Sequence, residues 1–181
     1  MAFESYYWKK NIKRDIGDIR KRMDISVNSL VGDKFDEAFS IVEIKLFMMA
    51  FSIRKLLDAR KLPDSVAEKT IKVTTYKRNK EHAGIFDFEK LYDYDNPIKQ
   101  SIKLSYLLNQ FIHAYVFQVF PTRKGNFRYL YVTSDWDRRK YLYHVDLKTF
   151  LRIMEKISNT HVTRSTTTYD QKTGEFVTKN Y

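Results

Sequence analysis

The chain contains no cysteine. It therefore forms no disulfide, offers no thiolate to a metal and has no cysteine nucleophile. This absence fits a reducing compartment, and we expect the protein in the cytoplasm. The first residues show no basic segment followed by an apolar one, so we expect no secretory signal. The most apolar stretch, residues 41–53, contains Glu43 and Lys45 and is too short to span a bilayer.

Glycine is scarce, with five residues in 181, and the five are far apart. Neither a phosphate-binding P-loop nor a dinucleotide-binding fingerprint can be written with them. The four histidines show no metal-protease spacing and no close pair, and no cysteine is present to complete a zinc site. No serine stands in a nucleophile-elbow context. We therefore expect no cofactor and no metal.

Acidic residues are outnumbered: 33 Lys and Arg stand against 22 Asp and Glu, for a net charge of +11. The excess is +3 in residues 1–65 and +8 in residues 66–181. A field of this sign favours anionic partners such as nucleic acid or an acidic protein, without choosing between them. The alternative is a basic surface that only keeps the protein soluble.

Hydrophobic residues make up 43% of the chain and aromatic residues 15%, which is ample material for the core of a single domain. Apolar residues at steps of three and four predict helices over about residues 8–23, 34–61, 101–120 and 147–158, the last one capped by Asp146. The second of these is apolar on opposite sides, so we expect other elements to surround it.

Alternating patterns predict a strand over residues 70–77 and a hairpin formed by residues 127–132 and 140–145. Residues 161–181 fit either a second hairpin or a frayed end. The expected fold is α+β: a helical bundle around one central apolar helix, with a small antiparallel sheet in the C-terminal half. Its helical part covers about residues 6–120, the hairpin and C-terminal helix residues 121–158, and a hairpin or flexible tail residues 159–181.

One polar group falls inside the predicted bundle. Asn109 and His113 are four residues apart, hence on one face of a helix. Glu43 and Arg54 on the central helix could meet them: a carboxylate to orient an imidazole, and a guanidinium to hold a phosphate oxygen. Histidine also suits general acid–base work near neutral pH. The alternative is that Asn109 and His113 only pin helix packing, or that His113 faces solvent.

The segment from Leu108 to His113 resembles a degenerate form of the Arg-Asn-x-x-x-His motif of HEPN domains. Asn109 and His113 match the motif, whereas Leu108 stands where the family has arginine, so Arg54 or Arg60 would have to replace that cation. The resemblance covers about residues 34–120. It implies a helical bundle that acts as a homodimer, and a metal-independent ribonuclease of the kind found in toxin–antitoxin and phage-defence systems.

A second candidate surface is the predicted hairpin, where tyrosines alternate along both strands beside basic residues. Aromatic rings next to cations on a sheet are what single-stranded nucleic acid needs, because bases stack and phosphates are neutralised. The alternative is that these tyrosines pack in the core. The candidate residues are Arg123, Lys124, Arg128, Tyr129, Tyr131, Arg138, Arg139, Lys140, Tyr141 and Tyr143.

Three functions follow as hypotheses. The first is binding of nucleic acid, RNA above all, by the basic aromatic hairpin. The second is a ribonuclease activity that uses His113. The third is a protein-interaction or regulatory module with an acidic partner.

Overall fold

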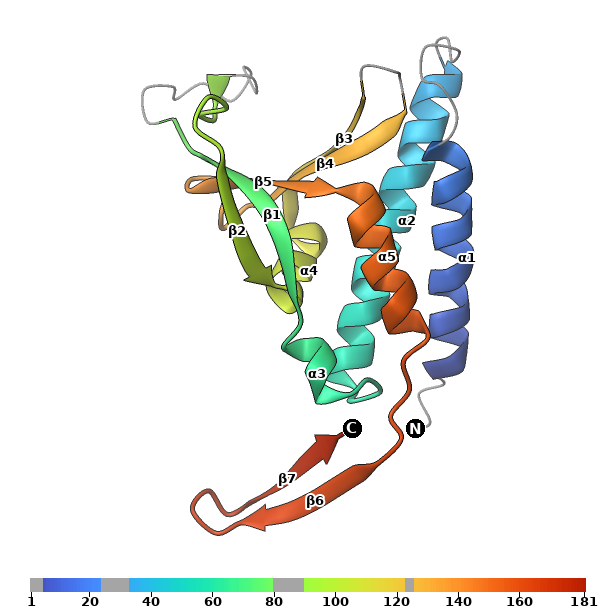
Figure 1. The fold of residues 1–181 in the computed structure, drawn as a ribbon, viewed down its shortest axis with the longest axis vertical. Helices are drawn as coiled ribbons and strands as arrows, with labels where there is room; N and C mark the ends of the chain where they lie inside the picture. The colour runs from blue at the N-terminus through green and yellow to red at the C-terminus, as the bar shows by residue number, and fades with distance from the viewer. Residues whose placement is uncertain (1–4, 24–32, 80–89, 123–125) are drawn as a thin grey trace.

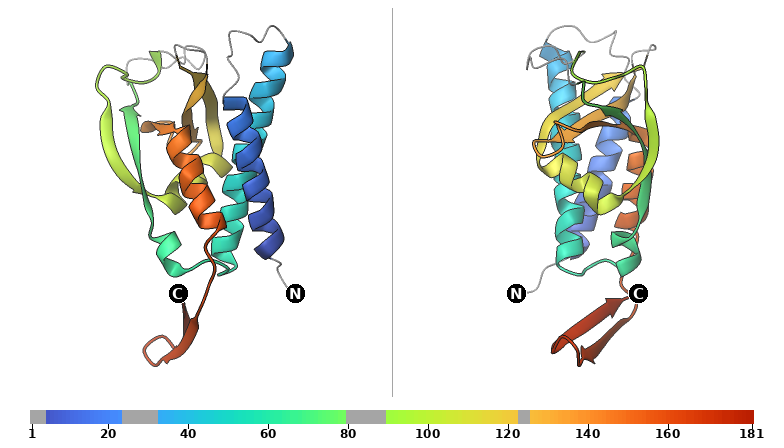
Figure 2. Two further views of the ribbon diagram at one scale, coloured as in Figure 1. Left: turned by 45° about the vertical axis from the view of Figure 1, so that its right-hand side comes forward. Right: turned by 90° about the vertical axis from the view of Figure 1, so that its left-hand side faces the viewer.

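In the computed structural model, residues 5–23, 33–79, 90–122 and 126–181 are described. They form a five-stranded antiparallel sheet with helices packed on one face, and a separate two-stranded sheet at the C-terminus (Figure 1). The strand order is β2-β1-β5-β4-β3. Figure 2, right, looks onto the sheet, with α1, α2 and α5 behind it.

The elements have the following bounds. The helices are α1 (Ser5–Met23), α2 (Asp33–Asp58), α3 (Asp64–Ala67), α4 (Leu104–Ile112) and α5 (Leu147–Ser158). The strands are β1 (Thr70–Lys77), β2 (Ile98–Lys103), β3 (Ala114–Pro121), β4 (Phe127–Ser134), β5 (Tyr141–Asp146), β6 (Ser165–Asp170) and β7 (Glu175–Asn180). None of the helices in these described segments is long and apolar enough to cross a membrane.

The expected fold class is wrong. The protein is not a helical bundle with a small hairpin, because the sheet has five strands, and its two edge strands, β2 and β3, overlap the segment expected to be a helix. The predicted helix over residues 101–120 is the main cause: only Leu104–Ile112 is helical, and the residues on either side belong to β2 and β3. Residues 114–121 pair with β4 instead of continuing the helix.

Other predictions are confirmed. The strand over residues 70–77 is β1, and the hairpin is β4 and β5. Helix α5 begins where expected, because the Asp146 carboxylate accepts a hydrogen bond from the Thr149 backbone N–H at 2.7 Å. The tail forms the β6–β7 hairpin, whose turn contains Gly174 at φ 70°.

The main core lies between the sheet and the helices. Ile12, Ile16 and Ile19 of α1 are buried there, and Ile71 and Val73 of β1 belong to the same core. Helix α2 contributes Val42, Leu46 and Ile53. The expectation that α2 is surrounded on all sides is wrong, since the side chains on its opposite face are exposed.

A buried polar group joins the layers at one end of the sheet. The Asp137 carboxylate, in the turn between β4 and β5, accepts hydrogen bonds from Gln110 Nε2 at 2.9 Å and from the Tyr143 hydroxyl at 3.1 Å. It also accepts one from the hydroxyl of Tyr106. Because Tyr106 and Gln110 belong to α4 and Tyr143 to β5, the turn is anchored to the helix that crosses beneath the sheet.

Candidate nucleic-acid interface

The sheet face turned away from the main core has an aromatic centre. A cross-strand row runs over all five strands through Lys99, Thr74, His144, Tyr131 and Gln118. Directly paired residues of neighbouring strands point to the same side of a sheet. The sheet thus presents a lysine at one edge, two aromatic rings in the middle and an amide at the other edge.

The aromatic rings of this row form a stack. The rings of Tyr131 and His144 lie 4.7 Å apart at an interplanar angle of 9°, and the Tyr76 ring lies beside both, 6.2 Å from His144 and 6.1 Å from Tyr131. The Tyr76 hydroxyl is hydrogen-bonded to His144 Nδ1 at 3.3 Å. Burial lowers the pKa of His144, so its imidazole is neutral at pH 7, and burial raises the pKa of Tyr131 to about 12. The stack is therefore uncharged at pH 7.

A hollow of about 480 Å³ opens beside this stack. Tyr129 and His144 form one wall, and Lys72 and Lys99 lie across from them. Both lysines are exposed, and neither makes an ion pair with a residue that the structure describes. Asp146 also borders the hollow, but its carboxylate is bound by Arg128 Nε at 2.5 Å and by the Thr149 N–H. The hollow thus holds two lysines that have no ionic partner within the described part of the chain.

The structure splits the predicted tyrosines into two groups. Tyr129 and Tyr131 stand on the outer face, at the hollow and in the stack. Tyr141 and Tyr143 point to the helices: Tyr141 packs against the main core, and Tyr143 is buried in it. Burial, followed by the Tyr106 hydrogen bond, raises the pKa of the Tyr143 hydroxyl far above its usual range. Of these four tyrosines, Tyr129 is the one that borders the hollow.

The predicted basic residues also divide. Arg138 lies with its guanidinium 4.1 Å from the centre of the Tyr115 ring and pairs with Asp135 at 2.8 Å. It lines a smaller hollow of about 260 Å³ together with the exposed Arg139. Lys140 is exposed nearby. Arg123 and Lys124 lie outside the described residues.

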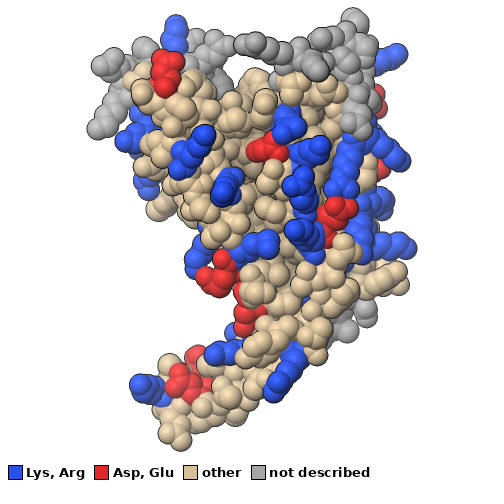
Figure 3. Space-filling model, in the orientation of Figure 1, with Lys and Arg blue, Asp and Glu red and all other residues tan. Residues whose placement is uncertain are grey.

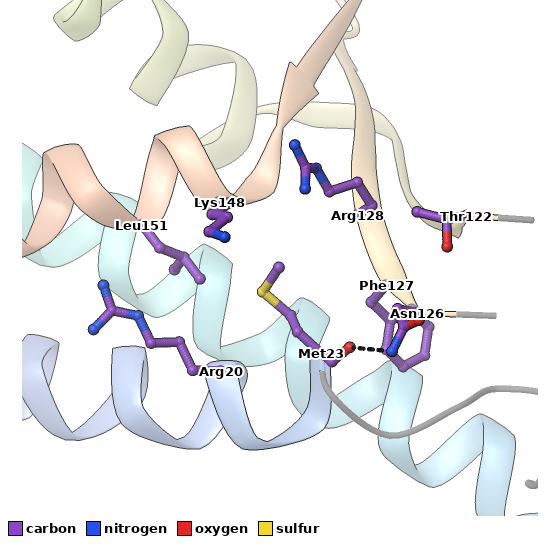
Figure 4. Close-up of a pocket in the computed structure, with 8 residues that line it drawn as sticks. All are labelled: Arg20, Met23, Thr122, Asn126, Phe127, Arg128, Lys148 and Leu151. Carbon is purple, nitrogen blue, oxygen red and sulfur yellow. Dashed lines mark hydrogen bonds between the residues drawn. The ribbon is translucent and has the colours of Figure 1, made fainter. Parts of the chain in front are cut away.

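Arg128 belongs to a third hollow, of about 470 Å³, on the helix side of the sheet (Figure 4). Arg20 and Lys148 border it over an apolar floor that includes Met23 and Leu151. Here Arg128 is paired with Asp146, and Nη1 and Nη2 of Arg20 donate hydrogen bonds to the Glu155 carboxylate at 2.8 and 2.7 Å. The surface over α1 and α5 is rich in Lys and Arg (Figure 3), yet two of the three cations in this hollow are already neutralised.

The residues predicted for catalysis come together only in part. Arg54 Nη1 donates a hydrogen bond to Asn109 Oδ1 at 3.2 Å, as the helix faces predicted. His113 follows the end of α4, is exposed, and its side chain makes no hydrogen bond within the described residues. Glu43 lies three turns from Arg54, about 16 Å along the helix axis. Burial raises the pKa of the Glu43 carboxyl.

The ribonuclease hypothesis therefore stays a prediction that depends on His113. It expects metal-independent cleavage of RNA that His113→Ala removes while the fold is retained. Cleavage that persists in this variant would exclude the assignment. Among the described residues, no three His, Asp or Glu side chains gather closely enough to hold a metal ion.

Sequence reasoning missed three residues of the outer face: Lys72, Lys99 and His144. Lys72 and His144 lie within predicted strands. Lys72 is two residues from Thr74, hence on the same face of β1, and His144 pairs directly with Tyr131. The missing information was the pairing of β1 with both β2 and β5, which brings segments some 25 to 70 residues apart onto one surface. Comparison of the chain with known protein families, with curated proteins and with solved structures gave no match.

Proposed function

We propose that the protein binds single-stranded nucleic acid, RNA above all, on the outer face of its five-stranded sheet. The observation that supports this most is the hollow in which Tyr129 and His144 face two lysines without an ionic partner among the described residues. Aromatic side chains that stack bases and cations that neutralise phosphates are the two requirements for binding an unpaired strand.

The aromatic contribution comes from the edge of the stack. Tyr131 is enclosed by its neighbours Tyr76, His144 and Phe120, so its ring supports the surface from below. Tyr129 stands at the hollow, and its cross-strand neighbour Phe120 is 38% exposed. These two rings are the ones that bases can reach. A duplex keeps its bases stacked inside, so a sheet surface of this kind favours an unpaired strand.

The ionic contribution comes from the opposite side of the hollow. Lys72 pairs with Ser101 in the β1–β2 register, and Lys99 pairs with Thr74, so the two lysines are diagonal neighbours on one face. Diagonal neighbours lie about 7–8 Å apart. A strand that lays its bases on Tyr129 can therefore place adjacent phosphates against both ammonium groups. An acidic protein would use the lysines but has no need of the aromatic wall.

The test is binding of a fluorescently labelled, unstructured RNA oligonucleotide, followed by anisotropy over a series of salt concentrations. Each phosphate contact on a single strand contributes about 0.7 to the slope of log K against log salt. The double variant Lys72→Ala/Lys99→Ala should weaken binding and reduce the slope by about 1.4. Lys10→Ala/Lys13→Ala removes the same charge from exposed positions of α1 and should leave the slope almost unchanged.

The aromatic part is tested separately. Tyr129→Ala should weaken binding by about 1–3 kcal/mol, the value of one stacked base, whereas Tyr129→Phe keeps the ring and should bind like the wild type. If both lysine pairs change the slope equally, or if Tyr129→Ala binds as tightly as Tyr129→Phe, the proposed surface is wrong. Binding of an acidic protein without any binding of RNA would favour the regulatory hypothesis instead.

A further inference from the structure

Helix α2 has an apolar face that the other described elements leave largely uncovered, although Phe51 meets α1, where its ring lies 6.3 Å from that of Trp8. Ile44 is 61% exposed, Met48 45% and Phe47 39%, while Phe51 is half-buried beside them. The opposite face of the same helix lies in the main core. In Figure 2, right, α2 forms the outer edge of the helix layer. A contiguous apolar patch of this kind marks an interaction surface.

The exposed face is self-complementary in sequence. Measured from residue 46, Ile44 and Met48 lie two positions away on either side, and Ile41 and Phe51 lie five positions away. An antiparallel copy of α2 centred on residue 46 therefore sets Ile44 against Met48 and Ile41 against Phe51. A twofold axis repeats each contact, as an isologous interface requires.

The charges at the two ends of this face obey the same symmetry. Glu37 and Lys55 each lie nine positions from residue 46. They are 18 residues apart, which is five full helical turns, so they point in the same direction. Both are exposed, and neither makes an ion pair with a described residue; Lys55 Nζ lies 5.8 Å from the centre of the Phe51 ring. In the antiparallel arrangement, Glu37 of each copy faces Lys55 of the other.

We propose that the exposed face of α2 binds a second copy of this chain, in an antiparallel arrangement with the twofold axis near residue 46. The apolar side chains supply the contact area, and the two Glu37–Lys55 pairs select the orientation, because a parallel pairing would set like charges against each other. The nucleic-acid surface lies on another side of the molecule, so this inference does not depend on the proposed function.

The first test is sedimentation of the full chain over a range of concentrations. We expect a monomer–dimer equilibrium for the wild type. Met48→Glu should raise the dissociation constant by tenfold or more, because it buries two carboxylates in the apolar centre. The control is Phe176→Glu, which places the same charge on an exposed aromatic of the β6–β7 hairpin and should leave the equilibrium unchanged. Circular dichroism would verify that both variants fold.

The second test is charge reversal. Glu37→Lys and Lys55→Glu should each raise the dissociation constant by about tenfold, since each sets like charges opposite one another twice. The double variant restores the opposite-charge pairs and should return the constant close to the wild-type value. A chain that is monomeric at every concentration, a dimer that Met48→Glu does not weaken, or a double variant that binds no better than the single ones would each overturn the proposal.

Discussion

Removal of the Asp137 carboxylate should destabilise the protein strongly. Asp137 is only 4% exposed, and its carboxylate accepts hydrogen bonds from Gln110, Tyr106 and Tyr143. Asp137→Ala leaves the buried Gln110 Nε2 without its partner, whereas the Tyr143 hydroxyl keeps the Tyr106 hydroxyl at 2.9 Å and the half-exposed Tyr106 can turn to water. A buried donor without a partner costs about 1–3 kcal/mol, which is the loss of stability that we expect.

The assay is urea unfolding followed by circular dichroism. Asp137→Asn keeps the shape and one acceptor oxygen and should lose less stability than Asp137→Ala. The matched control is Asp135→Ala, two residues earlier, whose carboxylate is exposed and pairs with Arg138. It should cost less than about 1 kcal/mol. If Asp137→Ala costs no more than Asp135→Ala, this polar group does not anchor the turn to α4, and the reasoning fails.

Two further predictions concern His144 and the C-terminal hairpin. Burial in the folded state lowers the pKa of His144 below its ordinary value of 6.5, so the unfolded state binds the proton more tightly. The free energy of unfolding should therefore fall as the pH drops below 6.5. Urea unfolding compared at pH 7.5 and pH 5.5 should show a smaller difference for His144→Gln than for the wild type. Gly174 has φ 70°, and a Cβ there would meet nothing closer than 3.9 Å, so Gly174→Ala adds backbone strain of about 1 kcal/mol without a clash. In Gly174→Ala, amide hydrogen exchange should quicken in β6 and β7 but not in α5, and the control Thr173→Ala should leave exchange unchanged. Faster exchange in both variants, or in neither, would contradict the role of the glycine.

The elements with strong local signals could be predicted from the sequence. The β4–β5 hairpin has two alternating runs on either side of a polar turn, and α5 has both a capping aspartate and a regular apolar face. The predicted bounds of α2, residues 34–61, are close to the observed Asp33–Asp58, because an apolar pattern of 3.6-residue period ends just before Pro63. In each case the information lies within a single helix or a single hairpin.

The helix expected over residues 101–120 shows where such reasoning fails. Leu104, Leu107, Leu108 and Phe111 have helical spacing, and the spacing continues by chance into Tyr115 and Val119. The segment 114–121 is rich in β-branched and aromatic residues, and pairing with β4 outweighs any helical preference. The signal that could have identified it is Pro121 and Gly125 between two such runs, which is typical of a hairpin connection.

The apolar residues on opposite sides of α2 predict complete burial within one chain, whereas Ile44, Phe47 and Met48 are exposed. Sequence periodicity reports that a face avoids water but not whether the same chain covers it. Likewise the tyrosines of β4 and β5 alternate identically in sequence, and only the register with β1 and the helices decides that Tyr129 is accessible and Tyr143 is buried. Such assignments depend on contacts between distant segments.

The most direct test of the nucleic-acid surface is an NMR titration of the protein with an unstructured RNA oligonucleotide. We expect the largest shift changes in the aromatic signals of Tyr129, Phe120 and His144 and in the amides of β1 and β2 around Lys72 and Lys99. The amides of α1 and the exposed face of α2 should move little. Shifts concentrated around Arg20 and Lys148, or no shift at any RNA concentration, would contradict the account.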